Sequence, residues 1–166
     1  MAFCKVLMTE REIMSYNHCN EALAATGVID IAKAPAEMSK EEVLSHQEAL
    51  PYPKEARFDG CGHFWGEGFY RQLAQEMDWQ RAAGQIAAEF GLMSEQAQVR
   101  TFPTEAPSYR ERWKADLDRF QVTLLKLGEP VLIWQRSLDG RWFFVQNRHT
   151  WGWVRAEQVA LTVEPQ

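Results

Sequence analysis

Residues Val131 to Leu161 read VLIWQRSLDGRWFFVQNRHTWGWVRAEQVAL, and this stretch indicates the fold. VLIWQRS and RWFFVQ have the composition of strands, and Asp139-Gly140 between them is a strong signal for a tight hairpin turn. NRHT then reads as a loop, WGWVR as a short strand, and EQVAL as a closing turn and strand. Residues 88–104 upstream also read as short strands. Several short strands with no helix between them predict a small antiparallel β-barrel.

The aromatic residues of these strands suggest which face is buried. Trp142, Phe144 and Trp153 alternate along their strands and are expected to fill the barrel core. Trp134 and Phe143 point the opposite way from their neighbours, so we expect them to cover the helices that precede the barrel.

Three short helices are expected before the barrel. Thr9 with Glu12, and Ser39 with Glu42, are spaced as capping boxes at the start of two of them. A third is expected to begin near Glu67. None carries a wide apolar face, so we expect all three to pack on something else. We therefore predict an α+β protein in which residues 1–90 form a short helical segment packed on a small antiparallel barrel of residues 91–166.

Composition and charge exclude some classes of protein. The chain has 166 residues and a net charge of −5, which argues against a broad electrostatic nucleic-acid footprint. Up to Glu95 there are 8 basic and 15 acidic residues, and from Gln96 onward there are 10 basic and 8 acidic residues. This shift supports two units with different roles. No apolar run is long enough to span a bilayer, and the N-terminus lacks the apolar core of a secretion signal.

Five ordered motifs carry a resemblance to a known family. In sequence order, they are RTFPT (100–104), DLDRFQ (116–121), LGEPV (127–131), RSLDGRWFFVQ (136–146) and GWVRAEQVAL (152–161). Together they resemble the first bacterial SH3-like domain of multidomain NlpC-type cell-wall peptidases, which cleave the peptidoglycan stem peptide at the γ-D-glutamyl bond. Upstream, TEREIMSYN (9–17), VIDIAKAP (28–35), SKEEVLSHQ (39–47) and FDG…FYRQL (58–73) are similar to the helical N-terminal clip of the same family.

The resemblance implies a function without catalysis. In the family, a separate papain-like domain further along the chain supplies the catalytic Cys and His residues. This chain ends at Gln166, directly after the predicted barrel, so we expect only the recognition and scaffolding half. The resemblance implies the cell envelope or periplasm, whereas the absence of a visible signal leaves the cytoplasm possible. No cofactor is indicated.

The stretch RFDGCGHFWGEGFY, residues 57–70, carries Cys61 and His63. We favour a simple turn, while thiol chemistry and a metal site remain open. A thiolate nucleophile needs a base that a third group orients, and no orienting group is evident. A zinc site usually has about four ligands, and this stretch offers two. His18, Cys19 and His46 are further potential ligands, but they have no fixed spacing from this stretch. The three cysteines, Cys4, Cys19 and Cys61, form no disulfide framework.

SH3-like folds bind peptides between the long loop after the first strand and the hairpin loop, so we expect ligand contacts there. Arginines pair with the carboxylates of a stem peptide, and aromatic faces grip its chain. The candidate contact residues are Trp113, Asp116, Asp118, Arg136, Ser137, Asp139, Arg148, His149 and Trp151. Asp118 and Asp139 are also typical turn formers, an interpretation that we favour for Asp139. Trp151 and His149 are expected at a loop tip.

Three functions remain in competition. The first, which we favour, is a non-catalytic cell-wall module that binds the stem peptide or docks on an NlpC-type catalytic domain. The second is an intracellular interaction adaptor, inhibitor or immunity-type partner. The third is an enzyme that uses Cys61.

Overall fold

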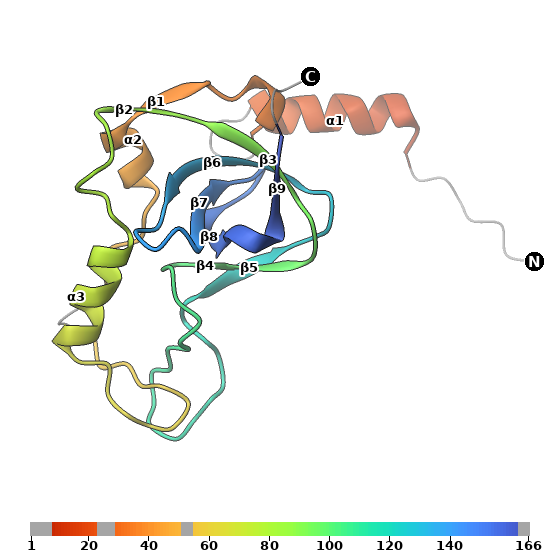
Figure 1. Ribbon diagram of the computed structural model, residues 1–166. Helices are drawn as coiled ribbons and strands as arrows, with labels where there is room; N and C mark the ends of the chain where they lie inside the picture. The colour runs from red at the N-terminus through yellow and green to blue at the C-terminus, as the bar shows by residue number, and fades with distance from the viewer. Residues whose placement is uncertain (1–7, 23–28, 51–54, 163–166) are drawn as a thin grey trace, which may run out of the picture.

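The computed structural model describes residues 8–22, 29–50 and 55–162 (Figure 1). The helical elements are α1 (Glu10–Ala22), the short 3-10 helix η2 (Ile31–Lys33), α2 (Lys40–Ser45), α3 (Glu67–Glu76) and the short 3-10 helix η3 (Ala156–Gln158). The strands are β1 (Glu37–Ser39), β2 (Gln85–Ala87), β3 (Glu89–Met93), β4 (Ala97–Arg100), β5 (Gln121–Leu125), β6 (Pro130–Arg136), β7 (Trp142–Gln146), β8 (Trp151–Arg155) and β9 (Val159–Leu161).

Seven of these strands form one antiparallel sheet in the order β5-β4-β8-β7-β6-β3-β9, and β1 pairs with β2 separately. The predicted hairpin is confirmed, because β6 pairs with β7 across a turn in which Gly140 has a φ of +70°. The described residues contain no pairing between the outer strands β5 and β9. The strands therefore form an antiparallel sheet, and closure into a barrel is not shown.

One face of the sheet curls around its own apolar cluster. Each of the seven strands contributes a buried residue to it, namely Met93, Val99, Leu125, Val131, Val145, Val154 and Val159. Residues from both outer strands meet in this cluster only because the sheet bends strongly, as Figure 1 shows. Most of these side chains are small, since the concave side of a narrow sheet has little room.

The opposite face of the sheet is covered by the N-terminal segment. Leu132, Trp134, Trp142, Phe144 and Trp153 share one cluster with residues of η2, α2, α3 and their flanks, namely Ile31, Val43, Tyr70, Leu73 and Met77. The chain thus has two apolar layers, one inside the curled sheet and one between the sheet and the preceding segment.

This arrangement corrects the predicted faces of the aromatic residues. Trp142, Phe144 and Trp153 face the N-terminal segment, and Phe143 lies inside the curl. Only Trp134 has the predicted orientation. Every residue of β7 is buried, so both of its faces are apolar. The alternation of its side chains therefore indicates two faces but does not show which of them lies inside the curled sheet. The large rings occupy the convex side, where the covering helices leave room for them.

The helix starts agree with the sequence. Thr9 and Glu12 exchange hydrogen bonds before α1, and Ser39 and Glu42 form a capping box at α2. The third helix begins at Glu67 as predicted.

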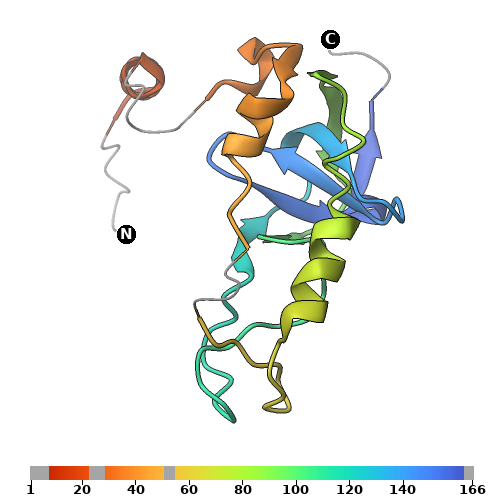
Figure 2. The same ribbon diagram turned by 90° about the vertical axis from the view of Figure 1, so that its left-hand side faces the viewer.

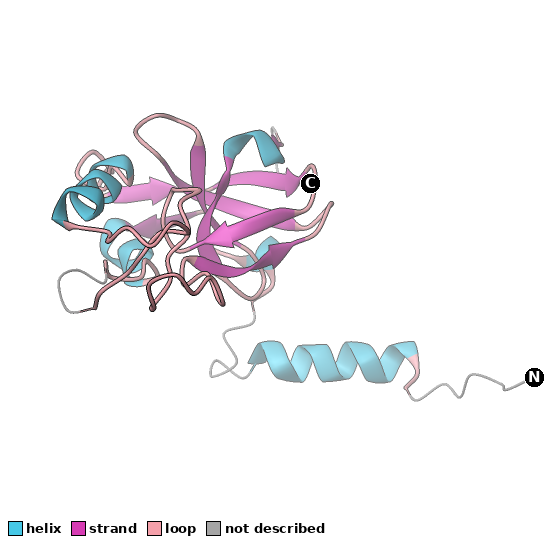
Figure 3. Cartoon of the chain, turned by 90° about the horizontal axis from the view of Figure 1, so that it is seen from below, coloured by secondary structure: helices cyan, strands magenta, loops and turns pink. Residues whose placement is uncertain are grey.

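Packing of α1 on the sheet was predicted wrongly. Met14 of α1 is 66% exposed and Tyr16 is 61% exposed, and Figures 2 and 3 show the helix standing apart from the sheet. The other helical elements do pack on it. The division of the chain near residue 90 stays a prediction, although β3 begins close to it, at Glu89. No helix in the described ranges is both long and apolar enough to cross a membrane.

Candidate functional site

Two loops extend together from one end of the sheet, as Figures 1 and 2 show. Phe58, in the loop before α3, forms isolated bridges with Phe64 and with Tyr109 of the long loop between β4 and β5. The backbone amides of Phe58 and Tyr109 donate hydrogen bonds to each other's carbonyls at 2.9 Å. Trp113 of the long loop lies over Gly62, and its side chain is otherwise exposed.

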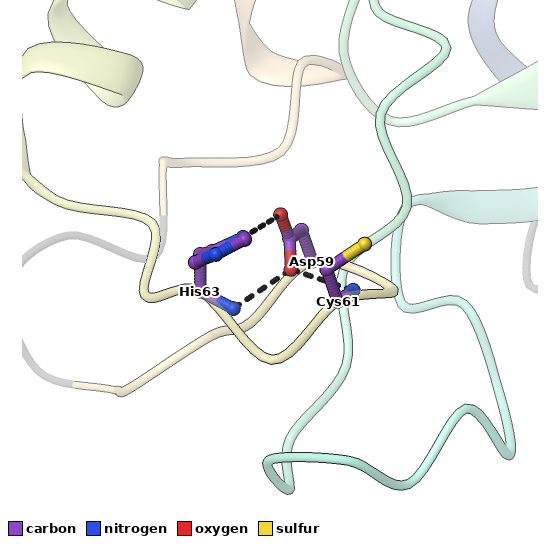
Figure 4. A group of neighbouring side chains, drawn as sticks. All are labelled: Asp59, Cys61 and His63. Carbon is purple, nitrogen blue, oxygen red and sulfur yellow. Dashed lines mark hydrogen bonds and ion pairs between the residues drawn. The ribbon is translucent and has the colours of Figure 1, made fainter.

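Asp59, Cys61 and His63 lie on one tight turn of the first loop (Figure 4). Oδ1 of Asp59 accepts hydrogen bonds from the backbone amides of Cys61 and His63, both at 2.8 Å. Its Oδ2 lies 2.9 Å from Nδ1 of His63. One potential ligand atom from each of the three residues lies within 4.8 Å of the other two.

The turn that the sequence favoured is therefore present, with Gly62 at a φ of +78°. Asp59 also orients His63, although no orienting group was evident in the sequence. Burial raises the pKa of the Asp59 carboxyl, but the hydrogen bonds from His63 and from the two amides outweigh it, so the pKa lies below its ordinary value. Cys61 and Cys19 are free and exposed, and Cys4 lies outside the described residues.

Asp118 braces the long loop. Its Oδ2 accepts a hydrogen bond from Nη2 of Arg100 at 3.0 Å, and its Oδ1 accepts the amides of Ser108 and Phe120, each at 2.9 Å. Asp116 is exposed, and its carboxylate accepts the amide of Leu117, which lowers the pKa of Asp116. Asp118 is thus engaged within the fold.

The predicted contacts of the β6–β7 hairpin are also engaged within the fold. Ser137 donates its hydroxyl hydrogen to Asp139 at 2.6 Å, and the same hydroxyl oxygen accepts the amide of Trp142. Asp139 also accepts the amide of Arg141, as a turn former does. Arg136 forms a two-point ion pair with Glu89 of β3. The amide of Leu138 donates to the carbonyl of Glu76, so α3 covers this hairpin.

Arg148 and His149 border a hollow of about 840 Å³ at the other end of β7. The hollow lies between the η2 segment and the sheet, and the amide of Ile29 donates to the carbonyl of Arg148 at 3.0 Å. Its lining residues are Ile29, Asp30, Ile31, Ala32, Phe90, Glu129, Pro130, Asn147, Arg148 and His149. Oppositely charged side chains therefore share one partly apolar concavity.

Asp30 and Glu129 supply the negative charges of this hollow. A hydrogen bond from Lys33 lowers the pKa of Asp30, with a smaller contribution from the charge of Arg148. Oε2 of Glu129 accepts a hydrogen bond from the amide group of Asn147. Neither carboxylate was among the predicted contact residues. Asp30 lies within the quoted VIDIAKAP motif, which was the available signal.

Trp151 has a different place from the one predicted. It begins strand β8 rather than sitting at a loop tip, and it is half-buried. Its ring stacks on His46, which follows α2, with centroids 4.0 Å apart and an interplanar angle of 2°.

The nine predicted contact residues thus lie in three places. Trp113, Asp116 and Asp118 belong to the long loop, and Arg136, Ser137 and Asp139 lie at the hairpin end of β7. Arg148, His149 and Trp151 follow the opposite end of that strand. Arg136 and Arg148 therefore lie near opposite ends of β7. Of the nine, Arg148 and His149 line the larger hollow.

A second, smaller hollow of about 400 Å³ lies on the β4 and β8 side of the sheet. Its arginines are already paired, since Arg100 contacts Asp118 and Arg155 contacts Glu105 at 3.0 Å. It is the weaker candidate because it is smaller and none of the nine predicted contact residues lines it.

Comparison with known proteins agrees with this architecture. Residues 109–155 match the family model of the SH3 domain, SH3b1 type. The matched SH3b1-type region runs from Tyr109 through the hairpin to the end of β8, so it contains the later part of the long loop and both ends of β7. No curated protein matches the sequence.

A solved structure resembles nearly the whole chain. It is described as a novel NlpC/P60 endopeptidase from Photobacterium damselae subsp. piscicida, and it aligns with a TM-score of 0.65 at 16% identity. The alignment covers 95% of this chain and 38% of that chain. At this identity the likeness shows a shared fold, which includes the N-terminal segment as well as the SH3b1-type region. The chain spans less than two fifths of that endopeptidase. The predicted resemblance to the SH3-like region of NlpC-type peptidases is confirmed.

Proposed function

We propose that the chain is a non-catalytic, peptidoglycan-associated SH3b1-type module that binds the stem peptide in the hollow beside Arg148. The observation that carries the proposal is the placing of Arg148, Asp30 and Glu129 around one partly apolar concavity. The SH3b1-type match supports it, because it includes Arg148 and His149.

The chemistry of a stem peptide suits this lining. Such a peptide carries free carboxylates, which pair with a guanidinium group, and a free amine, which pairs with carboxylates. Its alanine methyl groups suit an apolar wall, which Ile29, Phe90 and Pro130 provide here. A volume of about 840 Å³ lies within the range of small-ligand sites.

The test is calorimetric titration of the protein with the stem tripeptide L-alanyl-γ-D-glutamyl-diaminopimelate. Loss of one charge-assisted hydrogen bond lowers affinity by about tenfold or more. We therefore expect Arg148→Ala and Asp30→Asn each to weaken binding by that factor. Asp30→Asn retains an oxygen that accepts the amide of Ala32, so the start of η2 is preserved.

The matched control is Arg71→Ala, which removes an exposed arginine paired with Glu67 on α3. It is expected to leave tripeptide affinity unchanged. Absence of tripeptide binding by the wild-type protein, or equal affinity of Arg148→Ala and wild type, would contradict the proposed site.

Docking on an NlpC-type catalytic domain is a second candidate function. It is favoured by one observation: nearly all of this chain aligns with a minor part of an endopeptidase. Analytical ultracentrifugation of the chain mixed with a separately produced NlpC-type catalytic domain tests it. A stable complex that forms without peptide supports docking. If the chain instead binds a protein of another kind and has no affinity for peptidoglycan itself, the adaptor or inhibitor alternative is supported.

A further inference from the structure

The turn from Asp59 to His63 presents three chemically different metal-binding groups. Asp59 offers a carboxylate oxygen, Cys61 a thiol sulfur and His63 a ring nitrogen, and one atom of each lies within 4.8 Å of the others. Figure 4 shows the three side chains gathered at this turn. Neither the SH3b1-type match, which begins at Tyr109, nor the hollow beside Arg148 includes them.

The backbone beneath these side chains is already fixed. Oδ1 of Asp59 holds the amides of Cys61 and His63, and the amide of Gly62 donates to the carbonyl of Asp59 at 3.1 Å. Trp113 covers Gly62 from the neighbouring loop. Binding a metal would therefore need side-chain movement but little backbone ordering, which lowers its entropic cost.

We propose that Asp59, Cys61 and His63 bind a Zn²⁺ ion, with a fourth position open to water or to a ligand. One sulfur, one nitrogen and one oxygen donor suit Zn²⁺, whereas Mg²⁺ and Ca²⁺ prefer oxygen donors throughout. A turn by itself requires the Asp59 carboxylate and Gly62, but it requires neither a thiol at residue 61 nor an imidazole at residue 63.

The distances allow such a site after small adjustments. With metal bonds of about 2.0 Å, the nitrogen and oxygen ligands of a tetrahedral zinc ion lie about 3.3 Å apart. Nδ1 of His63 and Oδ2 of Asp59 are now 2.9 Å apart, so they need to separate only slightly. A thiolate and a nitrogen on the same ion lie about 3.5 Å apart, a separation that rotation of the exposed Cys61 side chain can provide.

Trp113 gives the site a built-in reporter. Its ring lies against Gly62, the residue between Cys61 and His63. A metal ion bound by the residues on both sides of Gly62 changes the surroundings of this indole. We expect Zn²⁺ to change the Trp fluorescence of the wild-type protein and not that of Trp113→Phe, although Trp113→Phe still binds the ion.

The deciding experiment is titration of the reduced 166-residue chain with Co²⁺, followed by displacement with Zn²⁺, in the absence of any peptide. A stoichiometric thiolate-to-cobalt charge-transfer band that Zn²⁺ abolishes is expected. Cys61→Ser should remove the band, and His63→Ala should weaken cobalt binding by about tenfold or more. Asp59→Asn should also weaken binding, while its remaining oxygen can still accept the two amides that shape the turn.

Cys19→Ser on α1 is the matched control, since it removes the other described exposed thiol, and it should keep the band unchanged. The proposal is overturned if wild type shows no thiolate-to-cobalt band, if Cys61→Ser retains it, or if Cys19→Ser loses it. Because no peptide is present, failure here leaves the stem-peptide proposal unaffected.

Discussion

The ring of Trp113 lies so close to Gly62 that a Cβ atom added at residue 62 would stand 2.8 Å from Cδ2 of the indole. The φ of Gly62 is +78°, which is itself unfavourable for any residue with a Cβ atom. Two loops that are far apart in the sequence thus meet at a position where glycine is required for both steric and backbone reasons.

Gly62→Ala is therefore expected to lower the free energy of unfolding by about 1–2 kcal/mol. Part of this loss comes from the backbone and part from contact with Trp113. In a Trp113→Ala background the contact part disappears, so the same substitution should cost at least about 0.5 kcal/mol less. Urea unfolding of the four proteins measures this coupling. Equal losses in both backgrounds would show that Trp113 does not contact Gly62 in solution.

Asp118→Ala is expected to destabilise the protein strongly. Arg100 is only 3% exposed, and Asp118 is its ion-pair partner, so removal of the carboxylate leaves a buried charge without its counterion. Such a loss costs about 3 kcal/mol or more. Asp116→Ala, two residues away and exposed, should change stability by less than about 0.5 kcal/mol. Similar thermal denaturation midpoints for the two variants would argue against the bracing role of Asp118.

The structural features that the sequence predicted correctly are those set by contacts between residues close together in the chain. The hairpin at Asp139-Gly140 and the capping boxes at Thr9 and Ser39 each rest on residues within a few positions of one another, and each was predicted correctly. The faces of Trp142 and Phe143 were predicted in reverse. Both faces of β7 are buried, and the choice between them depends on the curl of the sheet and on helices more than sixty residues away.

The candidate sites also depend on contacts that the sequence did not show. Arg148 and His149 were predicted as contacts, but the carboxylate of Asp30 comes to the same hollow from the other end of the chain. Asp59 and His63 are only four residues apart, yet their contact depends on a turn that uses the positive φ of Gly62. Sequence spacing alone does not show such a reversal of chain direction.

Gly152→Ala is expected to be severely destabilising. A Cβ atom at residue 152 would stand 2.5 Å from Cγ1 of Val99 and 2.8 Å from the backbone oxygen of Arg100, and a backbone atom cannot rotate away. We expect a loss of at least about 2 kcal/mol. Gly68→Ala in α3 is the control, because a Cβ there meets nothing within 4 Å, and alanine favours the helix by up to about 1 kcal/mol. Chemical denaturation of both variants should give effects of opposite sign.

Stability should fall in mildly acidic solution because of His46. Burial lowers the pKa of His46, whose ring stacks on Trp151, below its value in the unfolded chain. The unfolded state then binds the proton more readily, so this contribution is complete above the unfolded pKa of about 6.5 and is lost as the pH falls through it. His46→Phe retains a flat ring without a titrating group. Its melting temperature should therefore decline less than that of wild type between neutral pH and mildly acidic pH. Parallel declines would rule out His46 as the source.

The N-terminal segment and the seven-stranded sheet are expected to unfold together. Leu73 of α3 is 3% exposed and lies in the same apolar cluster as Trp134 and Trp153 of the sheet. Leu73→Ala should lower the free energy of unfolding by about 2–5 kcal/mol, whereas Met14→Ala on the exposed α1 should change it by less than about 0.5 kcal/mol.

Trp fluorescence reports largely on the sheet and far-ultraviolet circular dichroism on the helices, so coincident urea transitions in wild type and in Leu73→Ala check this prediction. If Leu73→Ala instead produced a separate early transition and left the fluorescence transition in place, residues 1–90 and 91–166 would be independent folding units. The large aromatic rings on the convex face of the sheet would then have to stay packed without the N-terminal segment that covers them. Because Trp134, Phe144 and Trp153 would all lose apolar contacts in that state, we expect the single transition.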